Sequence, residues 1–204
     1  GAALMDLGRV DEAITSLEKA LAIEPAFADA HHNMHAAVFD ENNMSPAISS
    51  LKATLAANPD NHEARAYLGM YLDFTGDKKG AEEHFSFIEK NVPSVYHKVD
   101  SWRYVKSHLN PGVRLFSLTR PALEYSFSKA KLAGLVLEFG VRNGVSTNIL
   151  ARLTDQDIHG FDSFEGLPEQ WEGMPVGALS TFNQLPKVPD HVHLHAGWFE
   201  DTLP

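Results

Sequence analysis

The chain has 204 residues, of which 44% are hydrophobic, and its formal net charge is −10. Because acidic residues are spread along it and no basic stripe is interleaved with aromatic residues, nucleic acid is disfavoured as the main ligand. No run approaches the roughly 18 apolar residues of a membrane span, and the absence of cysteine excludes disulfides, thiolate nucleophiles and cysteine zinc sites. We expect no membrane contact and, by default, a cytoplasmic location.

The N-terminal part of the chain repeats with a period of 34 residues. Within each unit, a glycine or asparagine supplies a turn between two helices because these residues tolerate a left-handed backbone. A small alanine then lets the helices approach closely, and a proline stops the second helix. The pattern predicts stacked helical hairpins. Its four columns are Gly8, Asn42 and Gly76; Ala13, Ala47 and Ala81; Leu17, Leu51 and Phe85; and Pro25, Pro59 and Pro93.

These columns resemble the tetratricopeptide repeat over residues 1–93. The second unit departs from that pattern, since His35 replaces a first-helix glycine and Thr54 replaces an alanine. Gly8 already lies in the turn, so the first repeat is expected to be truncated. The resemblance implies an α-helical repeat array that binds a protein partner or associates with itself. The best-matched unit contains Leu68, Gly69, Gly76, Ala81, Phe85 and Pro93.

Residues 94–133 lose the 34-residue register and are predicted to form a helical connector. The cluster Trp102-Arg103-Tyr104 suits either packing between domains or part of a substrate mouth. Asn110-Pro111-Gly112 is a turn signal. Thr119-Arg120-Pro121 is typical of a helix start, and the helix is expected to continue over Ala122–Leu132.

Residues 134–204 are predicted to begin an α/β domain. An apolar strand at about 134–140 runs into the glycine-containing turn Glu138–Gly144, and a helix begins near Ser146. A second strand, 158–162, ends in Asp162, which lies 18 residues after Gly144, and a third is expected at 191–196. In an open parallel sheet, such a turn and such an acid face one crevice, where a carboxylate can accept ribose hydroxyl protons.

The E-x-G-x-x-x-G spacing of this turn differs from the G-x-G-x-x-G of dinucleotide-binding folds, which argues against a nucleotide-dependent oxidoreductase. The turn resembles the first motif of class I S-adenosylmethionine-dependent methyltransferases. Asp162–Pro168 and Gly197–Pro204 are further similar to the macrocin O-methyltransferase-like branch, and the likeness covers about residues 135–204. The resemblance implies a Rossmann-like α/β domain, S-adenosylmethionine as cofactor, and O-methylation of a small molecule or sugar.

By that resemblance, Glu138 would help to orient the methionine amino group of the cofactor. Gly140 and Gly144 would admit the methionyl moiety, and Asp162 would bind the ribose. Ser146, near the start of the following helix, belongs to the same predicted cofactor-binding set. These residues all lie on the first two predicted strands or directly after them.

The adenosine half of the cofactor is assigned to later residues by the same resemblance. Ser163 and Phe164 would lie beside the adenosine, while Gly197 and Trp198 would border the adenine. Members of the branch commonly bind a divalent cation through acidic residues on and after a fourth strand, which would lie beyond Pro204. No catalytic residue is therefore assigned, and the α/β domain is expected to be incomplete at its C-terminus and inactive by itself.

His191, His193 and His195 alternate along the third predicted strand and share one face. Neighbouring histidines on that face are about 7 Å apart, too far to converge readily on one ion, so no metal site is predicted. Two hypotheses remain for the whole chain. One is a methyltransferase whose repeats recruit a partner, and the other is a non-catalytic scaffold that binds a peptide in the concave groove of its repeats.

Overall fold

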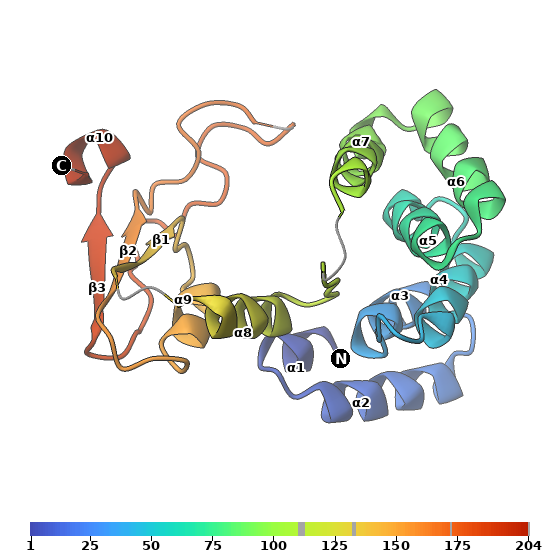
Figure 1. Cartoon of the computed structure of the whole chain (residues 1–204), viewed down its shortest axis with the longest axis horizontal. Coiled ribbons are helices and arrows are strands. Elements are labelled where there is room, and N and C mark those ends of the chain that lie inside the picture. The colour runs from blue at the N-terminus through green and yellow to red at the C-terminus, as the bar shows by residue number, and fades with distance from the viewer. Residues whose placement is uncertain (110–112, 132–133, 172, 204) are drawn as a thin grey trace. The chain divides into compact units, whose positions relative to one another are not determined.

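The computed structural model describes the whole chain except residues 110–112, 132–133, 172 and 204. The turn predicted at Asn110-Pro111-Gly112 therefore lies outside the described residues. The chain forms two compact units, Gly1–Leu118 (unit 1) and Thr119–Pro204 (unit 2), which are coloured blue to green and yellow to red in Figure 1. The boundary between the units falls inside the predicted connector.

Unit 1 is an array of helical hairpins. The hairpins are α1 (Ala2–Asp6) with α2 (Val10–Ile23), α3 (Ala28–Ala37) with α4 (Ser45–Ala57), and α5 (His62–Thr75) with α6 (Lys78–Asn91), and α7 (Pro93–Ser107) follows. Each hairpin packs on the next, and α7 packs on both α5 and α6. The predicted helical repeat array is confirmed, and the helix expected at the start of the connector is its last member.

Small side chains hold the paired helices together, as the repeat predicts. The alanine column is fully buried, with Ala13 and Ala47 at 0% exposure and Ala81 at 1%. A Cβ atom added to Gly69 would lie 2.6 Å from a ring carbon of Phe85, which is far closer than packed carbon atoms approach. The missing side chain of Gly69 therefore lets α5 lie directly against the aromatic ring of α6.

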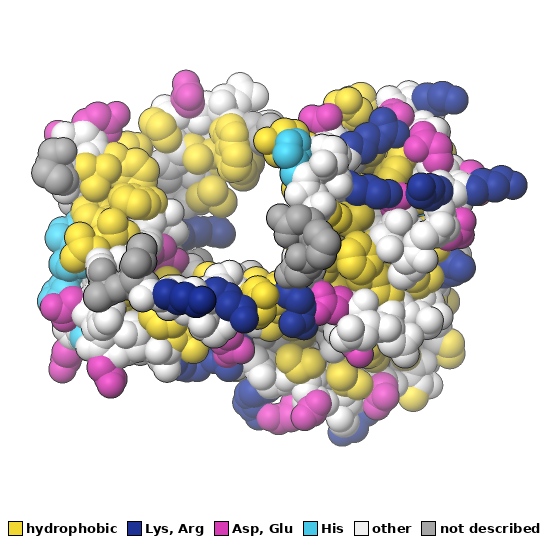
Figure 2. Space-filling model, in the orientation of Figure 1, with side chains coloured by type: hydrophobic (Ala, Val, Ile, Leu, Met, Phe, Trp, Pro, Cys, Tyr) yellow, Lys and Arg dark blue, Asp and Glu magenta, His cyan; other side chains and the backbone are white. Residues whose placement is uncertain are grey.

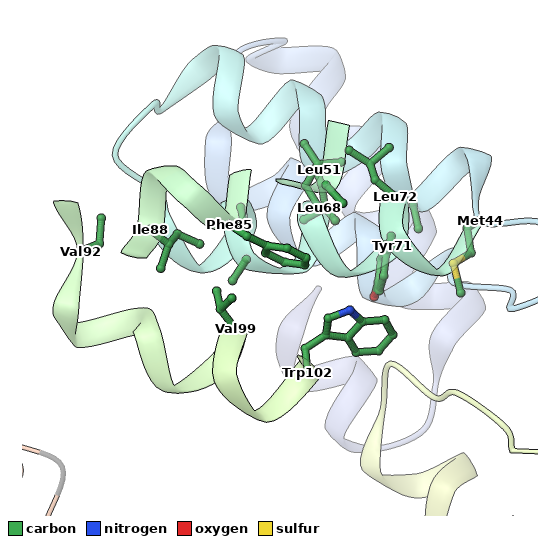
Figure 3. Close-up of a cluster of buried hydrophobic side chains, with 14 residues drawn as sticks. Met44, Leu51, Leu68, Tyr71, Leu72, Phe85, Ile88, Val92, Val99 and Trp102 are labelled. Atoms are coloured by element: carbon green, nitrogen blue, oxygen red, sulfur yellow. The ribbon is translucent and has the colours of Figure 1, made fainter. Parts of the chain in front are cut away.

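The last helix of unit 1 is fixed by a buried tryptophan. Figure 3 shows Trp102 of α7 beside Tyr71 and Phe85, within the larger hydrophobic core. Its indole N–H donates a 2.9 Å hydrogen bond to Asp73 Oδ2, and Lys106 forms an ion pair with the same carboxylate. Trp102 thus packs inside unit 1, where it joins α7 to α5.

The turn of the second hairpin differs from its prediction. Gly8 and Gly76 have φ of +74° and +98°, as expected for left-handed turn residues. Asn42 does not belong to the described residues with positive φ, so its predicted left-handed role is wrong. Because α3 already ends at Ala37, the connection is longer, and the side chain of Asp40 shapes it by accepting the N–H of Asn42 at 2.9 Å.

Unit 2 contains a small parallel sheet. Its described elements are α8 (Thr119–Lys129), β1 (Val136–Phe139), α9 (Val145–Leu150), β2 (Ile158–Asp162), β3 (Val192–Ala196) and α10 (Phe199–Thr202). The strands pair in the order β1-β2-β3, and both pairings are parallel. A helix-connected parallel pair of this kind agrees with a Rossmann-like arrangement. The three strands lie where the sequence predicts them.

The two faces of this sheet differ. One face buries Ile158 and Val192 against Ala151, which follows α9. The other face carries Leu137 and Phe139, which are 43% and 53% exposed. Figure 2 shows apolar side chains gathered on the strands and α10 of unit 2.

Among the helices of the described ranges, none is long and apolar enough to cross a membrane.

Candidate functional site

A pocket of about 400 Å³ opens on unit 1. It lies where α3, α5 and α7 present their side chains to the same space, and an irregular stretch after α7 forms one of its walls. Because α3 and α5 are the first helices of successive hairpins, the 34-residue period brings them to one side of the array, and α7, which follows the last hairpin, packs on α5. The lining residues are His32, Asn33, His35, Ala36, Phe39, Glu63, Tyr67, Met70, Tyr71, Trp102, Leu115, Phe116 and Ser117.

Aromatic rings form most of the pocket wall. The ring of His35 lies 5.0 Å from that of His32 and 5.4 Å from that of Tyr67, measured between centroids. Tyr71 continues the series, at 6.0 Å from His35 and 5.4 Å from Phe39. Such a wall offers flat apolar faces with polar edges, which suits an apolar or aromatic side chain of a ligand.

The charged group of the pocket is already neutralised. Glu63 Oε1 lies 2.9 Å from Lys98 Nζ, and it accepts a 3.3 Å hydrogen bond from the Tyr67 hydroxyl. Burial alone would raise the pKa of Glu63, but the hydrogen bond and charge of Lys98 outweigh it and lower that pKa. The carboxylate therefore stays ionised and paired, so a ligand need not supply a cation at this position.

His35 is uncharged at neutral pH. Burial lowers its pKa to about 4, although its Nδ1–H donates a hydrogen bond to the backbone carbonyl of His32 that favours the charged form. Within the described residues, His32 Nδ1 is buried without a hydrogen-bond partner. A buried nitrogen without a partner is costly, so a ligand group or a water molecule that reached it would be stabilised there.

Apart from His35 and Trp102, sequence reasoning did not single out the residues that line this pocket, although the repeat contains the signal for several of them. Asn33 and Tyr67 are 34 residues apart, as are Ala36 and Met70, so each pair occupies equivalent positions of consecutive first helices. Projecting the period onto the first helix of each hairpin would have found the wall.

In unit 2, Asp162 lies at the end of β2 and holds two neighbouring loops. Its carboxylate accepts the backbone N–H of Arg142 and that of Phe164, each at 2.7 Å. Both donors have positive φ, +48° and +58°, a conformation that is strained for side chains of this size. The acid predicted to bind ribose is thus also the acceptor that keeps these two turns in place.

The predicted glycines lie at the same edge of the sheet. Gly140, with φ of +92°, donates its N–H to a carbonyl of β2 at 2.9 Å, and Gly197 donates to the carbonyl of Asp162 at 3.0 Å. These bonds join the ends of the three strands. Gly144 is covered, since an added Cβ would lie 2.8 Å from Pro186 of the loop between β2 and β3.

The other residues predicted to bind the cofactor take local roles near that edge. Glu138 accepts a hydrogen bond from the hydroxyl of Thr147 in α9, and Ser146 is the second residue of the same helix. Glu138 belongs to β1 and Ser146 to α9, so the two residues lie on either side of the turn that joins these elements. The structure thus brings Glu138, Ser146 and the two glycines of the turn into one short segment.

Phe164 and Trp198 lie at the loops after β2 and β3. The side chain of Phe164 is 1% exposed and fixes the long loop after β2, whereas Ser163 Oγ accepts the N–H of Glu165 at 3.2 Å. Trp198 precedes α10, and its carbonyl accepts the hydroxyl of Thr202. In this arrangement the Phe164 ring is part of the protein interior.

A histidine that the sequence analysis did not consider joins those of β3. His159 of β2 places its Nδ1 atom 3.1 Å from Nε2 of His195, and His193 Nε2 lies 3.3 Å from Asp157. The parallel register, which pairs His159 with His193, is the reason, and it could not be read from β3 alone. Across the described ranges, no group of three or more such side chains is arranged to hold a metal ion.

The fold and these sites define a helical repeat array followed by a small parallel α/β unit. Residues 1–42 match a family model described as TPR repeat, and repeats of this kind imply protein–protein interaction. No methyltransferase family was matched. Comparison with curated proteins found no match, and comparison with solved structures found none.

The buried His35 makes the stability of unit 1 depend on pH. The unfolded state binds a proton at a pKa of about 6.5 and the folded state only at about 4. Stability from this group is therefore complete above pH 6.5 and is lost as pH falls toward 4, by roughly 3 kcal/mol at most. Urea unfolding at pH 7, 5 and 4 should show a smaller decrease for His35→Gln than for the unchanged chain, and equal decreases would contradict this assignment.

Removing the carboxylate of Asp162 should destabilise unit 2. Asp162→Ala leaves the N–H groups of Arg142 and Phe164 without their acceptor, which costs on the order of 1–3 kcal/mol. Hydrogen exchange at those two amides should become faster. Asp155→Ala, at an exposed loop position, is the matched control and should leave their exchange unchanged.

Proposed function

We propose that unit 1 binds an extended segment of a protein partner in the pocket beneath α3, α5 and α7. The observation that carries this proposal is the aromatic wall around His35, Tyr67 and Tyr71, which lines a pocket of about 400 Å³. That volume suits one or two apolar side chains. Because the ionic group in the pocket is already paired, affinity would come mainly from apolar burial and backbone hydrogen bonds.

Peptide selection tests this proposal while the partner itself is still unidentified. Random peptides displayed on phage are first selected for binding to the intact chain. The selected peptides should bind at least tenfold more weakly, by about 1.4 kcal/mol, to a chain that carries Tyr67→Ala or Met70→Ala. Lys79→Ala, an exposed position of α6 outside the pocket, should leave binding unchanged. If the selected peptides bind all three variants with unchanged affinity, the binding surface lies outside this pocket.

A second candidate function concerns unit 2, which we propose binds S-adenosylmethionine as a methyltransferase acting on an oxygen of a small molecule or sugar. The supporting observation is the meeting of Gly140, Asp162 and Gly197 at the carboxyl ends of parallel strands, where ligands bind in open α/β sheets. Asp162 uses one hydrogen bond on each oxygen, and a carboxylate oxygen can accept more than one. It therefore retains capacity for ribose hydroxyls.

Methyl transfer from the sulfonium would form a carbon–oxygen bond as the carbon–sulfur bond breaks, and the acceptor proton would pass to a base. The protein's part is to align the acceptor oxygen with the methyl carbon. The covering of Gly144 by Pro186 means that the loop after β2 would have to shift for a methionyl group to reach the backbone there. The methyltransferase proposal also includes a divalent cation, which acidic residues other than those described above would hold.

Calorimetric titration of the full-length protein with S-adenosylhomocysteine tests the cofactor proposal. Micromolar binding is expected, and Asp162→Asn should weaken it at least tenfold, since the amide keeps one acceptor for the backbone but loses the charge. Asp155→Asn is the control. If a folded protein gives no heat, the methyltransferase proposal fails and the non-catalytic repeat scaffold is the account that remains.

A further inference from the structure

Residues 113–118, which we call the strap, follow α7 without regular secondary structure and belong to unit 1. Although they are remote in sequence from the second hairpin, they bond to it. The N–H of Leu115 donates to Glu41 Oε2 at 3.0 Å, and the Ser117 hydroxyl donates to the carbonyl of Ala36 at 2.8 Å. The guanidinium of Arg114 forms an ion pair with the carboxylate of Glu41.

The strap also packs against apolar side chains of unit 1. Leu115 contacts the larger core, and Leu118 contacts the smaller core formed by the first two hairpins. Leu115, Phe116 and Ser117 form one wall of the pocket. The strap therefore lies across the binding surface and supplies part of it.

These contacts have the form of peptide recognition. A short segment without regular secondary structure uses a backbone N–H, a cation, apolar side chains and a hydroxyl to bind α3 and the loop that follows it, as linear segments do in grooves of other proteins. The first two residues of the strap are exposed, since the side chain of Arg114 is 45% exposed and Val113 is 40% exposed, whereas residues 115–118 are half-buried. Because it is covalently attached, its effective concentration is of millimolar order, so these few contacts suffice to keep it bound.

We propose that the strap is an internal ligand of the repeat groove, by which we mean the pocket of unit 1 together with Glu41 and the Ala36 carbonyl. The partner then carries a segment of the same chemistry, namely a cation followed by two apolar residues and a hydroxyl. This inference rests on the proposed peptide binding by unit 1 and names its ligand class. The partner segment pairs its cation with Glu41 and places its hydroxyl at the Ala36 carbonyl. It binds by displacing the strap.

A peptide with the sequence of residues 113–119, labelled with a fluorophore, tests the proposal by anisotropy. It is titrated into the intact chain and into a variant in which residues 113–118 are replaced by six Gly and Ser residues. The expected result is binding to the replaced variant with an affinity at least tenfold higher than to the intact chain. A peptide in which the arginine is changed to alanine should bind the replaced variant at least fivefold more weakly.

Point variants keep the test valid where the replacement impairs folding. Arg114→Ala in the intact chain weakens the strap but leaves the groove unchanged, so it should strengthen binding of the peptide, and addition of the peptide should accelerate hydrogen exchange at the Leu115 amide. Equal affinity for the intact and strapless chains, or no binding to either, overturns the inference. Peptides from display whose binding needs Tyr67 but is unaffected by the strap would overturn it while leaving the proposed function intact.

Discussion

The close approach of helices within each hairpin is the constraint on which unit 1 depends. A single hairpin has an apolar face that only adjoining helices cover, and covering it requires small residues at fixed positions. Ala47 is completely buried, and Gly69 leaves space that the ring of Phe85 fills. With this spacing, the first helices of successive hairpins reach one side of the array, where Trp102 of α7 completes the series. The pocket between these first helices thus depends on the tight packing of the two helices within each hairpin.

The pocket of unit 1 lies where the second repeat departs from the pattern of the third. At the position of Gly69 in the third unit, the second unit has His35, whose ring is nearly buried at 5% exposure. The imidazole contacts Tyr67 and Tyr71 and so replaces a close helix contact by an aromatic cluster. The exchange costs some stability in acid, because a buried imidazole resists protonation. A feature that weakens the match to a repeat family is therefore the feature that shapes its surface.

The periodic parts of this protein could be predicted from sequence and the long-range ones could not. The 34-residue columns and the apolar runs identified hairpins and strands, since these depend on neighbours at fixed spacing. The bond between Ser117 and Ala36 and the pairing of His159 with His193 depend on chain segments brought together only by folding. The sequence located Asp162 at a strand end, but its two backbone bonds depend on the conformation of the turn at Arg142.

The strap is also the last stretch of unit 1 before the first helix of unit 2. While it is bound to Glu41 and Ala36, those six residues add nothing to the length of free chain between the units. Once released, they would add a tether of about 20 Å when extended. Binding of a partner in the groove would then lengthen the tether between the units. Unit 2 could therefore move through a larger volume around the partner that unit 1 has bound.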